Sequence, residues 1–398
     1  MKKVLIWDDF PLTNSGGPSG YLYNIHEYLK QHPNMQITYL SDFLAQLGIY
    51  SVVEKEDNNP VSIIGKIRAH LKLILKYSWG IFNNRTHIVI PLEKLDKFDY
   101  VHFHNNPHLS QFKARYPNFK GKLILTSHCP CPWTDETLPR LPKYMRYFRG
   151  LMLSKECRNF RIADYIMFPC KDAREPYEKC KEIKAVFKSR EPAFFYVTSS
   201  IIDIVNNEKT IQSYASIGIP DDAFVITYFG RHNYIKGYDI LKTIGEKLLD
   251  RYSNLYFLCA GRGEIKPLKH ERWIELGFIN NTAELLEQSD LYILPNRETY
   301  FDLVLLEILR SRTNVIISDT GGNKYFKQYP DNERKGITYF DIDNIEKLLE
   351  LVSLCIEIKA TDPEKYLLYG KSNRALFENQ FTIDKFVMNY LESINALH

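Results

Sequence analysis

The chain has 398 residues, which predicts two domains at the usual size of about 100–200 residues each. Hydrophobic residues make up 44%, aromatic residues 14% and charged residues 25% of the sequence, a balance that excludes collagen-like, low-complexity and disordered classes. The net charge of +4 conceals an asymmetry, because residues 1–198 hold 29 Lys and Arg against 19 Asp and Glu, whereas residues 199–398 hold 23 against 29.

No run of about 18 apolar residues occurs, and the first ten residues, MKKVLIWDDF, place acids directly after a short apolar stretch. We therefore expect neither a membrane span nor an export signal. Seven cysteines, an odd number without framework spacing, predict reduced thiols and a cytoplasmic protein.

Short β-rich runs alternate with amphipathic stretches along the whole chain, and they do so in two series. The first series of predicted strands comprises residues 4–7, 37–40, 100–103, 123–126 and 165–168. The second comprises residues 224–229, 255–259, 291–294 and 315–318. This alternation predicts an α/β fold of two Rossmann-like, doubly wound parallel-sheet domains, with a ligand in the crevice at the carboxyl ends of the strands. The expected domains are residues 1–195 and 196–378, with a final segment, 379–398, returning to the first domain.

A glycine-rich turn follows the first predicted strand. Gly16 and Gly17 stand between Trp7, the end of that strand, and a predicted helix over residues 21–30. Glycine lets backbone amides approach an anion at a helix N-terminus, and the turn is equally explained as a tight connection without a ligand.

Basic residues of the first half gather in two segments, residues 61–90 and 139–161. The first holds five cations and no acid, and the second holds seven cations with Glu156 as its single acid. Trp79 and Tyr147 are among the aromatic residues interleaved with them. Such segments can lie on an anionic bilayer, or they can be ordinary surface helices with solvated charges. The basic half thus predicts an anionic partner, for which nucleic acid, a membrane surface and a phosphorylated substrate all qualify.

Histidines follow or end two strands of the first series. Strand alternation points His102 and His104 to one face, and His104, followed by Asn105, lies nearer to the strand's carboxyl end. His128 comes two residues after the next strand. We expect these side chains near the crevice, with a purely structural histidine as the alternative for His104.

Two patterns that could suggest a metal are better explained otherwise. Cys129 and Cys131 lie beside a histidine but lack the spacing of a closed zinc site, which indicates a shaped loop. Asp341 and Asp343 stand just before a helix expected to begin near residue 344, where helix capping accounts for them. No metal site is predicted.

Polar or glycine-rich turns follow the four strands of the second series. Fixed cations after the first of these strands suit a diphosphate. Four such turns at one edge of a sheet outline a site of nucleotide size. In chain order, the turns contain Arg231 with Lys236, Gly261, residues 295–302 and residues 321–324.

These motifs, GR…KG, AGRG, LP…E…FDLVLLE and a late GG, resemble the family 4 glycosyltransferases, which have the GT-B fold and are also called glycosyl transferase group 1. The resemblance covers nearly the whole chain and is most specific over residues 224–325. It implies transfer of a sugar from a nucleotide diphosphate sugar, with retention of anomeric configuration and without a metal or other cofactor.

The resemblance also implies roles for single residues. Arg231 and Lys236 would contact the donor diphosphate, Glu307 would bind the ribose hydroxyls, and Gly16 or Gly17 would approach the phosphates from the other domain. His128 would touch the donor sugar or the reacting centre, so the expected catalytic residues are His128, Arg231 and Lys236. Gly261 is expected at the donor, and His104 with Asn105 on the acceptor side.

One departure from the family pattern concerns the first position of the glutamate motif. The family has two glutamates separated by seven residues, whereas Glu298 and Glu307 have eight between them. Either Glu298 reaches the sugar hydroxyls through a one-residue bulge, or Thr299, in strict register, binds them with its hydroxyl. We favour Thr299. The donor-sugar side is completed by the residues that follow: Tyr300, Phe301 and Asp302.

The leading hypothesis is a metal-independent, hexosyltransferase-type enzyme that uses a nucleotide sugar and a glycan or lipid-linked acceptor in surface polysaccharide or glycolipid assembly. Peripheral contact with the inner face of an anionic membrane is part of it. A nucleotide-sugar epimerase or hydrolase of the same fold is the first alternative, and a degenerate, non-catalytic partner subunit is the second. Nucleic-acid binding is not expected, because the chain has no recognised module for it.

Overall fold

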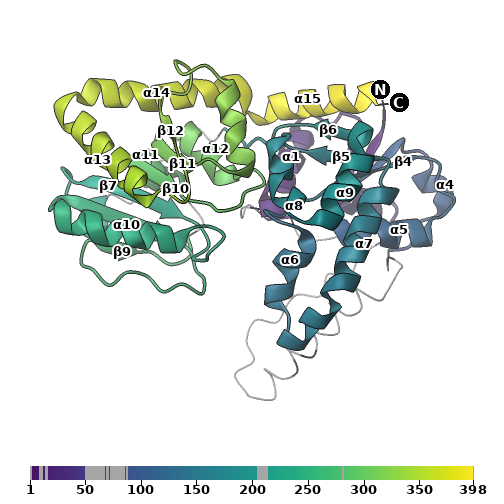
Figure 1. The fold of residues 1–398 in the computed structure, drawn as a ribbon. Coiled ribbons are helices and arrows are strands. Elements are labelled where there is room, and N and C mark those ends of the chain that lie inside the picture. Colours follow the sequence, from purple (N-terminus) through teal and green to yellow (C-terminus); the bar gives the residue numbers. More distant parts are fainter. Residues whose placement is uncertain are drawn as a thin grey trace.

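The structure is a computed structural model that describes residues 2–8, 12–13, 17–49, 68, 71, 86, 88–203, 214–279 and 282–397. Figure 1 shows two α/β bodies beside each other, with the last helix running back over the first body. Gly16 and most of the basic segment 61–90 lie outside the described residues.

The first body is built on a six-stranded parallel sheet of order β2-β1-β3-β4-β5-β6. Its core strands are almost entirely buried, as expected for a parallel sheet covered on both faces. The strands are β1 Val4–Trp7, β2 Ile37–Tyr39, β3 Tyr100–Phe103, β4 Lys122–Thr126, β5 Tyr165–Phe168 and β6 Phe194–Tyr196. The helices are α1 Gly17–Gln31, α2 Leu40–Gln46, α4 Leu92–Leu95, α5 Asn106–Arg115, α6 Trp133–Thr137, α7 Arg149–Ile162, α8 Glu175–Glu178 and α9 Lys181–Ser189.

The second body repeats the design with the order β12-β11-β10-β7-β8-β9, again all parallel. The strands are β7 Phe224–Phe229, β8 Leu255–Ala260, β9 Trp273–Glu275, β10 Leu291–Leu294, β11 Asn314–Ser318 and β12 Ile337–Phe340. The helices are α10 Tyr238–Arg251, α11 Ala283–Glu287, α12 Leu303–Arg310, α13 Ile345–Thr361 and α14 Pro363–Gln380. The last helix, α15 Ile383–Ala396, packs on the first body. The predicted α/β class with two doubly wound parallel sheets is confirmed.

Short 3-10 helices connect several of these elements. They are η1 Leu138–Arg140, η2 Lys143–Phe148, η3 Asp172–Arg174, η4 Glu191–Ala193, η5 Tyr214–Ile217 and η6 Gly321–Gln328.

The chain passes between the two bodies twice, and the two passages touch. Ile201 and Thr382 pair in an isolated parallel bridge, and α15 then packs on α1. Phe386 and Tyr390 of α15 belong to the same apolar cluster as Tyr21 of α1. The final helix therefore completes one face of the first sheet. The exact domain boundaries stay a prediction.

All seven cysteines are free thiols. Burial raises the pKa of the Cys157 thiol to about 11 and that of Cys170 to about 12. Among the described helices, none is both long and apolar enough to cross a membrane.

Candidate functional site

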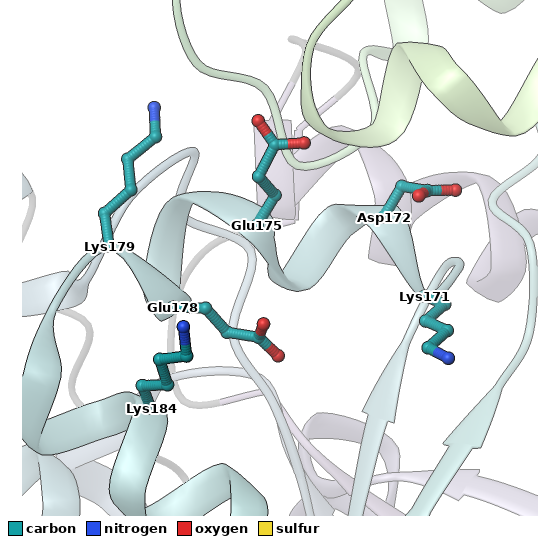
Figure 2. A pocket seen from close by; sticks show the side chains of 6 residues that line it. All are labelled: Lys171, Asp172, Glu175, Glu178, Lys179 and Lys184. Atoms are coloured by element: carbon teal, nitrogen blue, oxygen red, sulfur yellow. The ribbon is translucent and has the colours of Figure 1, made fainter.

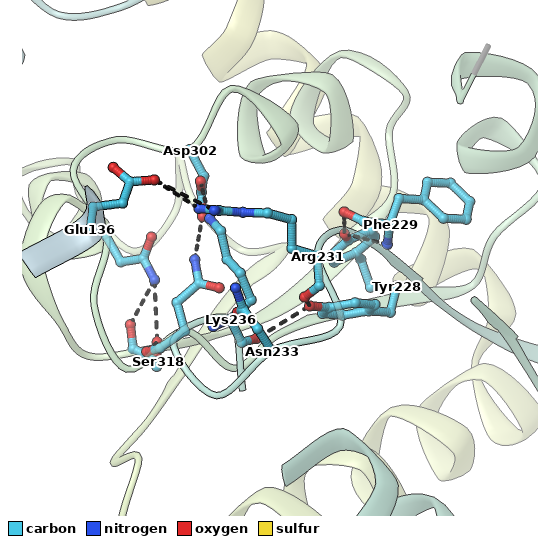
Figure 3. A network of polar contacts seen from close by, with 11 residues as sticks. Glu136, Tyr228, Phe229, Arg231, Asn233, Lys236, Asp302 and Ser318 are labelled. Carbon is cyan, nitrogen blue, oxygen red and sulfur yellow. Dashed lines mark hydrogen bonds and ion pairs between the residues drawn. The ribbon is translucent and has the colours of Figure 1, made fainter. Parts of the chain in front are cut away.

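The candidate site lies at the carboxyl ends of β7 and β10. These neighbouring strands lie where the strand order of the second sheet reverses, and a crevice at such a point is where doubly wound folds bind ligands. Arg231 and Lys236 follow β7 directly. The hydroxyl of Tyr228 donates to the carbonyl of Arg231 at 2.9 Å, and the amide of Lys236 donates to Asn233 Oδ1 at 2.9 Å. The loop that carries both cations is thus fixed by its own hydrogen bonds (Figure 3).

Gly237 allows this loop to meet the turn after β10. Its φ is +66°, and a Cβ atom there would lie 1.8 Å from the carbonyl oxygen of Pro295. Arg297 secures the same junction, because its guanidinium bonds both carboxylate oxygens of Asp239 at 2.7 Å and lies 3.6 Å from the ring centroid of Tyr234. Any other residue at position 237 would force the two turns apart.

Lys236 is held by a carboxylate at the start of α12. Its Nζ lies 2.6 Å from Asp302 Oδ1, and both side chains are largely buried, with 15% and 18% exposed. The amide of Asn296 donates to the second carboxylate oxygen of Asp302. Asp302 therefore fixes the Lys236 ammonium at the crevice and partly neutralises it.

Arg231 is held more loosely and by the other domain. Its side chain is 45% exposed, and its Nη2 lies 3.4 Å from Glu136 Oε1 of α6. Figure 3 shows the guanidinium extended toward Glu136, across from Lys236 and Asp302. Both predicted diphosphate ligands are thus paired with protein carboxylates in this structure.

Glu298 and Thr299, the two candidates for the irregular motif position, are placed differently. Glu298 is turned toward the first domain, where its Oε1 accepts from Lys179 Nζ at 3.2 Å. Thr299 is fully buried, and its hydroxyl has no partner among the described residues. Its carbonyl accepts from the amide of Gly322 at 3.2 Å, and a Cβ at Gly321 would lie 2.2 Å from that carbonyl oxygen. The late glycine pair thus brings η6 against Thr299.

The side chains of Tyr300 and Phe301 pack into apolar surroundings. The Tyr300 ring lies edge-on to His128, with centroids 5.9 Å apart, and 5.3 Å from Phe168 of the first domain. Phe301 stacks on Phe326 of η6. The side chains of both residues are therefore used in packing, and their role at the donor sugar stays a prediction.

Glu307 and Gly261 lie on the side of the crevice formed by α12 and β8. Thr282 donates its hydroxyl to Glu307 Oε2 at 3.0 Å, and burial raises the pKa of Glu307 while Arg310 opposes that rise. Gly261 has φ +139°, and a Cβ there would lie 1.8 Å from the carbonyl oxygen of Gly230. The turns after β7 and β8 are therefore in backbone contact.

The first domain contributes a cluster of histidines. His104 Nδ1 and His128 Nε2 are 2.8 Å apart, and the centroids of the His102 and His104 rings are 4.1 Å apart. Burial lowers the pKa of His102 and of His128 to about 3, and it lowers that of His104 as well. The cluster is neutral at physiological pH. Asn105 lies next to it, with its amide 3.3 Å from His108 Nε2.

Gly17 is the first residue of α1, with φ +78° and open space where a Cβ atom would lie, whereas the neighbouring glycine is not described. No three His, Cys, Asp or Glu side chains converge as metal ligands within the part of the chain that the structure describes. Asn344 caps α13 by accepting from the amide of Lys347, whereas Asp341 Oδ1 accepts from the amide of Asp343 at 3.1 Å. The prediction that these two acids cap the helix was therefore wrong.

A hollow of about 380 Å³ lies on the first domain beside the crevice. Figure 2 shows its charged side chains rising from η3, α8 and α9. Glu175 on its rim pairs with Lys324 of η6 at 2.5 Å, and Lys179 pairs with Glu298 as described above. The residues that line it are Lys171, Asp172, Glu175, Glu178, Lys179 and Lys184.

Some residues of the site were missed by sequence reasoning. Glu136 belongs to no local motif and reaches the site through tertiary packing. Asn296 lies in the predicted turn 295–302, but its contact with Asp302 was not predicted. Asp239, in the first turn of α10, and Arg297, after β10, are 58 residues apart and meet only in the folded chain.

Comparison with known proteins supplies the family. Residues 223–357, from β7 into α13, match the family described as Glycosyl transferases group 1. Over 152 residues the chain is 26% identical to an uncharacterised glycosyltransferase of Methanocaldococcus jannaschii, which covers 35% of this chain and 37% of that protein. Over 204 residues it is 24% identical to the O-antigen biosynthesis glycosyltransferase WclY of Escherichia coli, which covers 49% of this chain and 53% of that protein. The matches thus span about a third to a half of these relatives.

Solved structures supply the fold. HepE of Anabaena, crystallised in complex with UDP-glucose, aligns over 100% of both chains with a TM-score of 0.63 and 14% sequence identity. Sucrose-phosphate synthase of Thermosynechococcus elongatus aligns over 99% of this chain and 98% of that chain with a TM-score of 0.62 and 12% identity. Residues 223–357 of this chain therefore match the group 1 glycosyl transferases, and the chain as a whole has the GT-B fold.

Proposed function

We propose that the chain is a retaining, metal-independent glycosyltransferase that moves a hexose from a nucleotide diphosphate sugar to a glycan or lipid-linked acceptor. The observation that carries this proposal is the pair of cations, Arg231 and Lys236, at the strand reversal of a domain that matches the group 1 family. The complex of HepE with UDP-glucose favours a uridine diphosphate hexose as donor. The name of the Escherichia coli relative favours a surface polysaccharide as the product.

The chemistry rests on replacing protein carboxylates by the donor diphosphate. When the diphosphate enters, Arg231 exchanges Glu136 for phosphate oxygens, and Lys236 shares its ammonium between Asp302 and the phosphates. Fixed cations then stabilise the charge that develops as the bond between the sugar C1 and the phosphate oxygen breaks. Removing one group that stabilises this developing charge typically lowers turnover by about 10²–10³-fold.

Retention follows from attack on the face that the leaving group vacates. The acceptor oxygen forms the new bond to C1, and its proton passes to the departing phosphate oxygen. In this step the sugar is never bonded to the protein, so neither the neutral histidines nor the buried carboxylates act as a nucleophile. A glycosyl group trapped on any side chain, or a product of inverted anomeric configuration, would contradict this part of the proposal.

The donor's remaining groups have candidate partners. The carboxylate of Glu307 can accept from two vicinal ribose hydroxyls. Of the two candidates for the irregular motif position, the partly exposed Glu298 is the one open to a sugar hydroxyl, because Thr299 is fully buried. The hollow beside Glu298 is a candidate for the acceptor, because its alternating carboxylates and ammonium groups suit a polyhydroxylated chain.

Peripheral membrane contact is part of the proposal. Apolar side chains of η2 and α7 are exposed among cations of the same segment, and Tyr147 is 90% exposed. Aromatic and basic side chains together favour the interface of an anionic bilayer. The exposed apolar residues of this segment are Tyr144, Tyr147, Phe148 and Leu151.

The test begins with ligand binding. UDP and UDP-glucose should raise the melting temperature of the wild-type chain, because a ligand that binds only the folded state stabilises it. Lys236→Met should abolish most of that shift and lower turnover by about 10²-fold or more, since it removes one of the two fixed cations.

Lys247→Met serves as the matched control, because Lys247 lies on α10 and pairs with Glu346 on the protein surface. It should behave as wild type. Wild-type turnover in Lys236→Met would reject the site, and release of free sugar or of an epimerised nucleotide sugar in place of transfer would favour a hydrolase or epimerase.

A further inference from the structure

His104 is buried beneath His128 and is not open to a ligand. Only 4% of its surface is exposed, and its Nδ1 contacts His128 Nε2 at 2.8 Å. His128 itself is half-buried, between Tyr21 of α1 and Tyr300 of the second domain, at centroid distances of 4.8 and 5.9 Å. The ring of His128 is therefore clamped on two sides and bonded at its inner nitrogen.

The contact between the two rings fixes a relation between their protons. Burial lowers the pKa of both histidines, so each is neutral and carries one N–H group and one lone pair. In a hydrogen bond between two neutral imidazoles one nitrogen donates and the other accepts. Either His104 Nδ1–H donates to His128 Nε2, or His128 Nε2–H donates to His104 Nδ1.

The far nitrogen of His104 distinguishes the two cases. His104 Nε2 is buried and has no partner among the described residues. His102 cannot supply one, because its two nitrogens bond Tyr390 Oη at 2.8 Å and Thr126 Oγ1 at 2.7 Å. A buried N–H without an acceptor is rarer in proteins than an unsatisfied lone pair. We therefore assign the lone pair, and not the proton, to His104 Nε2. The proton of His104 then resides on Nδ1.

We propose that His104 is a positioning residue that donates to His128 Nε2 and thereby holds His128 as its Nδ1–H tautomer. His128 then presents an N–H to the crevice and acts on the donor sugar as a hydrogen-bond donor. It has no free lone pair with which to take the acceptor's proton. The inference deepens the proposed function and rests on it only for the identity of the ligand, because the tautomer exists without substrate.

The experiment measures ¹⁵N chemical shifts of histidine side chains in the full chain, with the His128 signals assigned by their loss in His128→Gln. Wild type should show a protonated Nδ1 and an unprotonated Nε2 for His128. His104→Asn keeps an amide donor at the position of Nδ1 and should preserve this tautomer. His104→Leu removes the donor and should shift His128 toward the Nε2–H form.

Turnover gives the second readout. His104→Leu should lower kcat about tenfold or more with little change in KM, and His104→Asn should recover most of that loss. A protonated Nε2 on His128 in wild type, or equal losses in both variants, would overturn the assignment. The wild-type spectrum decides even where His104→Leu fails to fold. An Nδ1–H tautomer in a chain that transfers no sugar would reject the proposed function alone.

Discussion

The two cations of the site differ in how firmly the protein holds them. Lys236 and Asp302 form a close, largely buried pair that an incoming anion will share. Arg231 and Glu136 form a longer and more exposed pair, and such pairs contribute about 0–1 kcal/mol. Glu136 is therefore the carboxylate that a diphosphate displaces most readily.

Glu136→Gln should strengthen the binding of UDP by about two- to tenfold. The substitution removes a negative charge that competes for Arg231 and repels the phosphates, and an exposed charge pair of this kind is worth about 1 kcal/mol. Isothermal titration calorimetry would measure the Kd. Asp135→Asn is the control, because Asp135 lies on the same helix and pairs with Arg149. An unchanged or weaker affinity in Glu136→Gln would show that Glu136 does not compete with the ligand.

At the scale of elements, α6 owes its position to a carboxylate on α7. Glu156 is fully buried, and it accepts from the amides of Trp133 and Thr134 at 2.7 and 3.0 Å and from the Thr134 hydroxyl at 2.7 Å. These are the unpaired amides of the first turn of α6. Because α6 carries Glu136, the cap on α6 also sets where that carboxylate meets Arg231.

Glu156 makes stability depend on pH. Desolvation raises the pKa of Glu156 from 4.5 to about 7, so the folded state holds this proton more tightly than the unfolded chain does. The stability linked to the proton is present in full below about pH 4.5 and is lost as the pH rises through about 7. Glu156→Gln, which cannot titrate, should therefore gain stability relative to wild type between pH 5 and pH 8, by up to a few kcal/mol.

Urea unfolding at pH 5 and pH 8 would measure the difference in the free energy of unfolding. Glu93→Gln provides the control, because Glu93 is an exposed carboxylate on α4. A difference between Glu156→Gln and wild type that is the same at both pH values would contradict the assigned pKa.

Sequence patterns predicted most strands because doubly buried strands are continuous apolar runs. Residues 100–103, 165–168, 224–229 and 291–294 are strands with the predicted bounds. Three strands were absent from the prediction. They have three or four residues each and are only partly buried, so their apolar signal is short: β6, β9 and β12.

The site was predictable in part for a similar reason. Arg231, Lys236 and the glycines lie in turns directly after predicted strands, and the fold brings such turns together. The partners of those cations were not predictable in the same way. Glu136 meets Arg231 from 95 residues away, through the docking of one domain on the other, which no local pattern encodes. The pairing of His104 with His128 likewise depends on the register of β3 against β4.

At the scale of the whole molecule, charge is divided between the domains in a way that net charge conceals. The acidic half carries the predicted diphosphate site on a few fixed cations, each beside a carboxylate. The basic half carries exposed aromatic side chains on η2, which directly precedes α7. Figure 1 shows α7 extending away from both sheets.

The chain should float with vesicles that contain anionic lipid and should remain in solution with neutral vesicles. Cations near an anionic surface contribute about 1 kcal/mol each, and the exposed aromatic rings enter the interface. Replacing Tyr147 and Phe148 by Ser should reduce flotation severalfold.

Phe278→Ser provides the control for this experiment, because Phe278 is an exposed aromatic residue of the second domain. Its flotation should match that of wild type. Flotation that does not depend on anionic lipid, or that survives the loss of Tyr147 and Phe148, would reject membrane contact through this segment.

The buried free thiols allow the opening of each domain to be measured separately. Cys157 and Cys170 are buried in the first domain and Cys259 in the second, and burial raises the pKa of all three thiols. Only thiolates react with alkylating reagents, so each cysteine stays unmodified until its own surroundings open. The order in which these thiols become alkylated in mild denaturant therefore shows which domain opens first. A bound nucleotide would slow alkylation of the thiols in the domain that holds it.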